Sequence, residues 1–190
     1  KTGDYIEMGA YSGKPIMWRC IGSDENGKLM LSDGMICSKA YDGKGVHTPS
    51  TTDRYGGSNI WSQSNIRCWL NSDAEKVEYI CGNPPNNYNT LANEYDWEWG
   101  FLTNFEENEK KLIKQVQQKT ALNEMDIAAA DGTYTKVTFA FDNDWEPLYE
   151  ERYYQFTEDK IFLLDEEQLL MAITNLDDGF YKNGKKTGHM

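Results

Sequence analysis

Carboxylates are the side chains of this sequence best suited to chemistry. Asp142, Asp144 and Glu146 form one acidic cluster, and Asp96 with Glu98 forms another. Carboxylate oxygens at this density can hold a hard cation such as Ca²⁺, although neither cluster has the glycine and the terminal glutamate of an EF-hand loop. A carboxylate pair in an aromatic cleft can also hydrolyse a glycosidic bond. A solvated acidic loop is the simpler interpretation, so we expect no metal and no cofactor, with calcium binding at the first cluster as an alternative.

Nucleophilic catalysis has little support in the sequence. The histidines are His47, which has no motif around it, and His189 near the end of the chain. The cysteines are widely spaced and form no C-x-x-C pair: Cys20, Cys37, Cys68 and Cys81. This spacing disfavours zinc and dithiol sites and favours reduced structural cysteines, with one or two disulfides as the alternative. Glycine-rich phosphate-binding loops are also missing from the sequence, so nucleotide binding is unsupported.

Aromatic residues in polar stretches are the best candidates for ligand contact. Aromatic rings on ordered loops provide large, rigid surfaces for a glycan or a protein. The residues that we predict to bind a ligand are Trp97, Trp99, Trp145, Tyr95 and Tyr149. The alternative is that these rings fill a satellite core beneath long loops.

Other aromatic residues lie in segments with a regular pattern. Trp18, Trp61 and Trp69 belong to apolar or helical segments, and we expect them to pack in the main core. Arg67 lies between two of them in the sequence. We expect it to form a structural ion pair with a buried carboxylate, with stacking on an indole as the alternative.

The composition excludes several classes of protein. With 190 residues the chain is long enough to form one domain with a substantial core. Hydrophobic residues make up 39% of it, and no run approaches the ~20 apolar residues of a membrane-spanning helix. A net charge of -12 disfavours binding to a phosphate backbone, and 13% aromatic residues disfavour disorder. We therefore expect a folded domain without a nucleic-acid partner and without membrane insertion.

The first part of the sequence predicts a β-meander. Residues 4–9, 15–21 and 28–32 have the composition of strands, and turn residues separate them. Asn26-Gly27 favours a tight hairpin between the last two, because both residue types tolerate a positive φ. Long loops are predicted at 42–59, 72–102 and 123–157, the last of which includes a possible strand at 136–141.

Helical patterns follow the meander. Residues 59–71 predict a helix that Ser62 or Ser64 caps. Residues 104–118 give the clearest helical pattern, with Asn104 as the cap and one apolar face. That face consists of Phe105, Leu112, Ile113 and Val116. A buried strand is expected at 159–164, followed by a helix at 166–173 that Asp165 caps.

Several segments together resemble a known family. They are Gly3 to Ile6 with Pro15-Ile16-x-Trp18-Arg19; Trp61-x-x-Ser64-x-x-Arg67-x-Trp69-Leu70-Asn71; Phe105 with Glu109 and Ile113; and Asp159 to Leu164 followed by Glu166-Glu167. In these elements the chain resembles a bacterial domain of unknown function that is common in gut Firmicutes and often attached to secreted or surface proteins. The resemblance implies a C-type-lectin-like fold, related to that of formylglycine-generating enzymes, and further strands after Thr187-Gly188. It implies no catalytic residues.

These observations lead to one set of expectations. The fold class is α+β, with a small twisted antiparallel sheet, two main helices and long loops, in a C-type-lectin-like arrangement. Residues 1–190 form a single domain that lacks the C-terminal strands of its family, with loop insertions near 72–102 and 123–157. The expected function is non-enzymatic recognition of a glycan or protein by a secreted or cell-surface bacterial domain. The alternatives are a carboxylate-based enzyme that acts on a saccharide and a structural spacer module.

Overall fold

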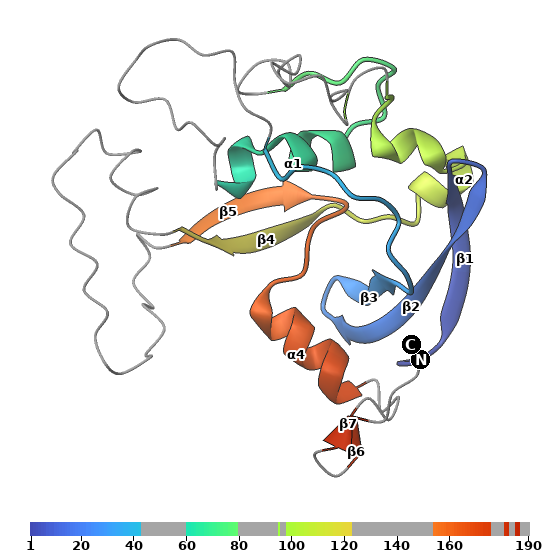
Figure 1. Cartoon of the computed structure of the whole chain (residues 1–190), viewed down its shortest axis with the longest axis vertical. Helices are drawn as coiled ribbons and strands as arrows, with labels where there is room; N and C mark the ends of the chain where they lie inside the picture. The colour runs from blue at the N-terminus through green and yellow to red at the C-terminus, as the bar shows by residue number, and fades with distance from the viewer. Residues whose placement is uncertain are drawn as a thin grey trace, which may run out of the picture. The chain divides into compact units, whose positions relative to one another are not determined.

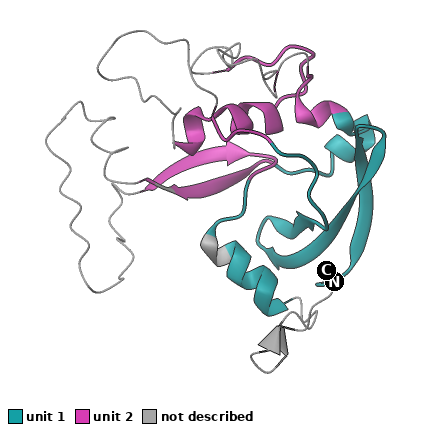
Figure 2. Cartoon of the chain, viewed as in Figure 1, with its two compact units in different colours: residues 1–38, 104–114, 163–190 teal, residues 39–103, 115–162 magenta. Residues whose placement is uncertain are grey.

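The chain divides into two compact units that alternate along the sequence (Figure 2). Unit 1 consists of residues 1–38, 104–114 and 163–190, and unit 2 consists of residues 39–103 and 115–162. The structure is a computed structural model, and it describes residues 1–42, 60–79, 95, 98–122, 154–175, 181–182 and 185–186.

Unit 1 begins with a three-stranded antiparallel sheet in the order β1-β2-β3 (Figure 1). Its strands are β1 (Tyr5–Tyr11), β2 (Lys14–Asp24) and β3 (Gly27–Ser32). The Asp24 carboxylate accepts hydrogen bonds from the amides of Asn26 (2.8 Å) and Gly27 (3.1 Å), and Gly27 has a φ of 134°. Local turn chemistry therefore closes the second hairpin, and the predicted meander is confirmed.

The buried face of β2 forms the core of unit 1. Ile16, Trp18 and Cys20 alternate along the strand and are each at most 9% exposed. The Trp18 indole N–H donates to the carbonyl of Met8 (2.8 Å), and its ring lies 6.2 Å from that of Phe105. The expected core position of Trp18 is thus confirmed, with its single polar atom satisfied.

Helix α4 (Glu166–Asn175) packs against β2 in the same unit. Asp165 caps it as predicted, because its carboxylate accepts from the Gln168 amide (2.7 Å) while the Gln168 side chain accepts from the Asp165 amide (3.1 Å). Ala172 is buried, and the Asn175 side chain donates to the Ile21 carbonyl (2.9 Å). The short strands β6 (Tyr181–Lys182) and β7 (Lys185–Lys186) follow.

Unit 2 consists of a helical segment beside a two-stranded antiparallel sheet (Figure 1). The helical segment includes a 3-10 turn, η1 (Trp61–Gln63), and helix α1 (Asn65–Leu70). The sheet pairs β4 (Val116–Ala121) with β5 (Tyr154–Asp159), so that Val116 lies opposite Asp159. Figure 1 shows α1 running alongside this sheet. A hydrogen bond from Arg67 in α1 to the carbonyl of Glu158 in β5 joins the two, and Asn71, the C-cap of α1, binds the carbonyl of Ile161 just after β5.

The prediction of one long helix at 104–118 is wrong. In its place the chain forms the 3-10 turn η2 (Phe101–Asn104), the one-turn helix α2 (Glu107–Lys110) and strand β4. Glu106 and not Asn104 is the N-cap of α2, in a capping box with Glu109. Phe105 is buried, but Leu112 is 69% exposed, so the predicted apolar face does not exist. Pairing with β5 overrides the helical preference of residues 116–118.

The strand predicted at 159–164 is shifted. Strand β5 ends at Asp159, and Leu163 is 48% exposed beyond it. Residues 154–157, predicted as loop, therefore belong to β5. The possible strand at 136–141 lies outside the described residues.

The fold class is α+β with small antiparallel sheets and few helices, as predicted. Within the part of the chain that the structure describes, no helix has the length and apolar character that crossing a membrane requires.

Candidate functional site

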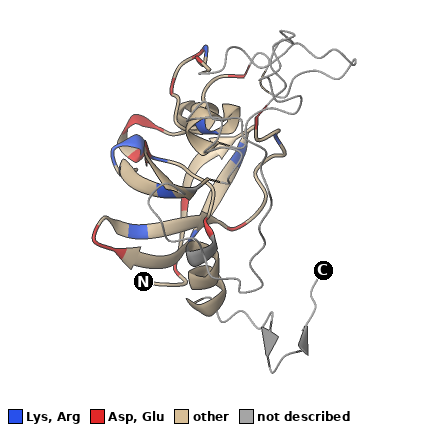
Figure 3. Cartoon of the chain, turned by 90° about the vertical axis from the view of Figure 1, so that its left-hand side faces the viewer, with Lys and Arg blue, Asp and Glu red and all other residues tan. Residues whose placement is uncertain are grey.

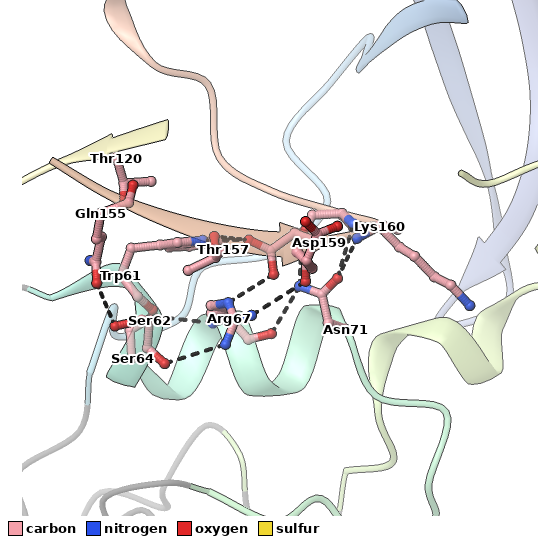
Figure 4. Close-up of polar contacts among 12 residues, drawn as sticks. Trp61, Ser62, Ser64, Arg67, Asn71, Thr120, Gln155, Thr157, Asp159 and Lys160 are labelled. Atoms are coloured by element: carbon pink, nitrogen blue, oxygen red, sulfur yellow. Dashed lines mark hydrogen bonds and ion pairs between the residues drawn. The ribbon is translucent and has the colours of Figure 1, made fainter. Parts of the chain in front are cut away.

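The carboxylate of Asp159 is the most deeply buried charge in the structure described here. Asp159 is 0% exposed and lies at the end of β5. Its oxygens accept hydrogen bonds from Arg67 Nε (2.7 Å), Trp61 Nε1 (2.8 Å) and Thr157 Oγ1 (2.5 Å), as Figure 4 shows. The predicted structural ion pair of Arg67 is thereby confirmed. With three donors and no exposed surface, this carboxylate has no open position for a substrate.

The guanidinium of Arg67 also binds backbone carbonyls on both sides of the ion pair. Its two terminal nitrogens donate to the carbonyls of Ser62 and Glu158, each at 3.3 Å. The Ser62 hydroxyl donates to Gln155 Oε1 (2.6 Å). One planar fork therefore joins η1, α1 and β5, a task for which a point charge such as lysine is poorly suited.

Asn71 ends α1 and connects it to the residues after β5. Its side-chain amide donates to the carbonyls of Arg67 (3.1 Å) and Ile161 (2.8 Å). Its Oδ1 accepts from the amides of Lys160 (2.7 Å) and Ile161 (3.2 Å). A single side chain therefore binds four backbone groups at a helix end and just after a strand end, where backbone groups often lack partners within the element.

The backbone amides at the start of α1 also have hydrogen-bond partners. Ser64, one of the two predicted caps, accepts from the Arg67 amide (3.3 Å). The Asp42 carboxylate accepts from the Asn65 amide (3.0 Å), and the Tyr41 carbonyl accepts from the Ile66 amide (3.1 Å). Residues 41–42 are thereby fixed against the helix.

The residues on which the family resemblance depends are thus mostly scaffold residues. Trp61, Ser64, Arg67 and Asn71 on one side bind Asp159 and its neighbours on the other, or cap the helix between them (Figure 4). The arrangement stabilises the contact of α1 with β5, and it supplies neither a nucleophile nor a free general base.

A second cluster of unit 2 is aromatic and surrounds Trp69. Trp69 is 1% exposed, and its ring centroid lies 5.0 Å from that of Phe101 and 6.2 Å from that of Tyr95. Tyr79 extends the cluster, with its ring 5.8 Å from that of Tyr95. The expected core positions of Trp61 and Trp69, which are 5% and 1% exposed, are confirmed.

Lys39 lies within this aromatic cluster. Its side chain is 4% exposed, and its Nζ lies 4.6 Å from the centroid of the Trp69 ring and 4.9 Å from that of Tyr95. The ammonium also forms an ion pair with the carboxylate of Glu98. Glu98 belongs to the second acidic cluster of the sequence, and here its charge is balanced by a lysine. Among the described residues, no group of three or more metal-ligating side chains occurs.

Trp99 follows Glu98 and is the exposed member of the predicted aromatic set. Its side chain is 54% exposed, but its carbonyl accepts a hydrogen bond from Trp69 Nε1 (3.0 Å). The next amide, of Gly100, donates to the Ala74 carbonyl (2.8 Å), and that of Leu102 donates to the Ser72 carbonyl (2.9 Å). A large ring is thereby held at the surface by a fixed backbone.

The other predicted ligand-binding residues are placed differently. Tyr95 is 5% exposed and its hydroxyl donates to the Ala40 carbonyl, so this ring packs in the core, as in the alternative interpretation. Trp97, Trp145 and Tyr149 lie outside the described residues. So do these candidates for other chemistry: His47, His189, Cys81, Asp96 and the cluster Asp142, Asp144 and Glu146. The thiols of Cys20 and Cys68 are free, as expected.

Sequence reasoning missed Lys39 and Asp159. A single lysine in a polar stretch is almost always exposed, and nothing in the residues around Lys39 indicates an aromatic environment. Asp159 precedes an apolar run, and two of its partners, Arg67 and Trp61, lie 92 and 98 residues earlier in the chain. The only available signal was Arg67 itself, since an arginine between two core tryptophans requires a carboxylate partner.

Comparison with models of protein families identifies a match. The model of a family described as Domain of unknown function (DUF6273) matches residues 26–188. No curated protein and no solved structure shows significant similarity to the chain.

Proposed function

Since the chain belongs to the DUF6273 family, whose description assigns no activity, we propose a function from the geometry: non-enzymatic recognition of a ligand through Trp99. A glycan is the first candidate ligand and a protein the second. The observation that carries the proposal is an indole that is 54% exposed on a backbone that neighbouring residues hold by hydrogen bonds.

A fixed, exposed indole is suited to binding for a physical reason. Exposing a large apolar ring to water is unfavourable, while fixing its backbone in advance reduces the conformational entropy that a ligand must overcome. The hydrogen bond from Trp69 supplies this fixation from inside the core. Trp and Tyr side chains are also the residues that contribute most to recognition surfaces.

The polar surroundings favour a glycan over a protein. Asp73 and Glu75 are exposed and flank Ala74, whose carbonyl binds the amide after Trp99. Exposed carboxylates on the segment that pairs with residues 100–102 offer acceptors for sugar hydroxyls, whereas a protein interface has a larger apolar centre. Lysine, arginine and acidic positions are interspersed along the described ribbon (Figure 3), which does not support a phosphate-backbone ligand.

The remaining parts of the proposal have separate support. The resemblance to domains of secreted and surface proteins of gut Firmicutes supports an extracellular bacterial protein. The same resemblance supports a C-type-lectin-like fold. A saccharide-cleaving enzyme has less support, because Asp159 is fully buried among three hydrogen-bond donors and Glu98 is paired with Lys39.

A glycan array followed by calorimetric titration of the retained glycan tests the proposal. We expect Trp99→Ala to weaken binding at least about tenfold, since recognition tryptophans often contribute 2 kcal/mol or more. The melting temperature should remain unchanged, because the ring is outside the core. Phe156→Ala is the matched control: Phe156 is 59% exposed in the same unit, and its loss should leave binding intact.

Undiminished glycan binding by Trp99→Ala would show that Trp99 is not the contact. If the array retains no glycan but a protein partner is captured in a Trp99-dependent manner, the second candidate ligand is correct. The corresponding alanine variants of Trp97 and Trp145 extend the test to the predicted residues beyond the described part of the chain.

A further inference from the structure

Lys39 is a charged side chain in a place where charge is costly. Its side chain is 4% exposed, and moving an ammonium out of water is unfavourable unless other groups compensate for the lost hydration. Here the Glu98 carboxylate and the faces of Trp69 and Tyr95 provide that compensation. Two aromatic rings with a carboxylate form a cage of the kind that binds alkylammonium groups.

The groups of this cage are also the groups that hold Trp99. Glu98 is the residue directly before Trp99 in the chain. Trp69, whose ring faces the Lys39 ammonium, donates its indole N–H to the Trp99 carbonyl (3.0 Å). The ammonium therefore contacts the supports of the exposed indole through two independent routes, one through Glu98 and one through Trp69.

The opposite side of the cage is fixed to the chain around Lys39. The Tyr95 hydroxyl donates to the carbonyl of Ala40, the next residue after the lysine. Residues 41 and 42 then cap α1 through the amides of Ile66 and Asn65. Lys39 is consequently anchored on a segment that cannot shift without breaking these bonds.

We propose that Lys39 is the positioning residue of the Trp99 binding surface, and that it acts through the charge of its ammonium in the cage of Trp69, Tyr95 and Glu98. Without the charge, Glu98 loses its ion pair with Lys39. We then expect its carboxylate, which is 26% exposed, to turn toward water. The backbone of Trp99 then loses one of its supports. The importance of this role rests on the proposed function, but the role itself can be measured without a ligand.

Indole N–H resonances provide the test. The Trp99 resonance of the full chain is assigned by its loss in Trp99→Phe. It is then followed in Lys39→Met, which keeps the unbranched side chain, one heavy atom shorter, and removes the charge. We expect both the Trp99 and Trp69 resonances to move. Lys119→Met is the matched control, because Lys119 also lies over a ring of unit 2, that of Tyr154 at 3.8 Å. It should move neither resonance.

Chemical rescue separates charge from bulk. Lys39→Ala leaves room for the missing part of the side chain, which n-propylammonium reproduces. We expect n-propylammonium to return the Trp99 resonance toward its original position, and 1-propanol, which has similar size and no charge, to have no such effect. Equal rescue by both compounds would overturn the proposal, as would an unmoved Trp99 resonance in Lys39→Met.

If both variants fail to fold, the wild-type chain decides the question. Ring currents shift protons above an aromatic face to higher field, so the Lys39 ε-methylene protons should resonate upfield of those of the other lysines. Ordinary ε-methylene shifts for every lysine would refute the cage. None of these readouts involves a ligand. If Trp99→Ala bound every ligand as well as the wild type does, the proposed function would be refuted and this inference would still stand.

Discussion

At the scale of single residues, the ion pair of Arg67 and Asp159 allows a quantitative prediction. Asp159→Asn replaces a buried carboxylate by an amide, which leaves the Arg67 charge without its partner and turns a donor toward Trp61 or Thr157. Breaking one side of a buried pair costs about 3 kcal/mol or more. We expect urea unfolding to show this loss in the free energy of unfolding.

Asp73→Asn serves as the control, because Asp73 is exposed in the same unit. Its substitution should change the free energy of unfolding by no more than about 0.5 kcal/mol. If Asp159→Asn were equally mild, the carboxylate would not be the organising charge of unit 2.

Glu107 allows a prediction about protonation. A hydrogen bond from the Lys110 ammonium (2.8 Å) lowers the pKa of Glu107 from its ordinary value of 4.5, with a smaller contribution from the charge of Lys111. A lowered folded-state pKa means that the pair stabilises the fold above the unfolded-state pKa, and that this contribution is lost as the pH falls through the lowered value.

Carbon NMR titration of the Glu107 carboxyl tests this direction. In Lys110→Met the midpoint should return toward 4.5, and Lys111→Met should produce a smaller change, because that lysine makes only the lesser contribution. A wild-type midpoint at or above 4.5 would contradict the prediction.

At the scale of elements, the pairing of residues 72–74 with 100–102 depends on Gly100. A Cβ at this position would overlap with the carbonyl of Ser72, which is backbone and cannot rotate away. We therefore expect Gly100→Ala to lower the free energy of unfolding by about 2 kcal/mol, as overpacking does, and to displace Trp99. In Gly34→Ala the added Cβ meets nothing within 4 Å. That control should change stability by less than about 1 kcal/mol.

The elements that sequence reasoning predicted correctly are those that local chemistry determines. The hairpin between β2 and β3 follows from Asp24 and Asn26-Gly27, and the start of α4 follows from Asp165 and Gln168. In each case residues within three positions of one another supply the hydrogen bonds. A pattern read from neighbouring residues is sufficient for such elements.

Elements that depend on distant pairing could not be predicted in this way. Residues 104–118 contain good helix formers and apolar residues at helical spacing, yet β4 forms because β5 lies beside it. The buried face of this sheet is polar, with Gln118, Thr157 and Asp159 each at most 9% exposed. Hydrogen-bond donors on η1 and α1 bind the Asp159 carboxylate. A buried polar face of this kind shows no alternation of hydrophobic and polar residues in the sequence, so it could not be predicted.

For the candidate site, too, the sequence alone predicted some residues correctly and failed for those whose position depends on distant contacts. Trp99 could be selected from its polar surroundings, and it is exposed. Tyr95 has the same kind of sequence neighbourhood but is buried, because its hydroxyl binds Ala40 and its ring packs on Trp69. Which aromatic residue of a loop faces water depends on contacts with segments far away in the sequence, so the sequence alone could not separate the two.

At the scale of the whole molecule, the interleaving of the two units determines how the protein should unfold. The chain passes from one unit to the other after residues 38, 103, 114 and 162. While unit 2 is folded, its internal contacts restrict the two long connections between the segments of unit 1. Once unit 2 unfolds, each becomes a flexible loop whose closure costs unit 1 roughly 3 kcal/mol. That cost is a large fraction of the 5–15 kcal/mol that typically stabilise a domain.

We therefore expect the protein to unfold in urea in one cooperative transition. The indole N–H resonances of Trp18 in unit 1 and of Trp61 and Trp69 in unit 2 can monitor it. All three midpoints should agree, and Asp159→Asn, which acts inside unit 2, should lower the Trp18 midpoint as well. A Trp18 midpoint that stays unchanged while those of Trp61 and Trp69 fall would mean that unit 1 tolerates the flexible loops. The alternation of segments along the chain would then not couple the two units energetically.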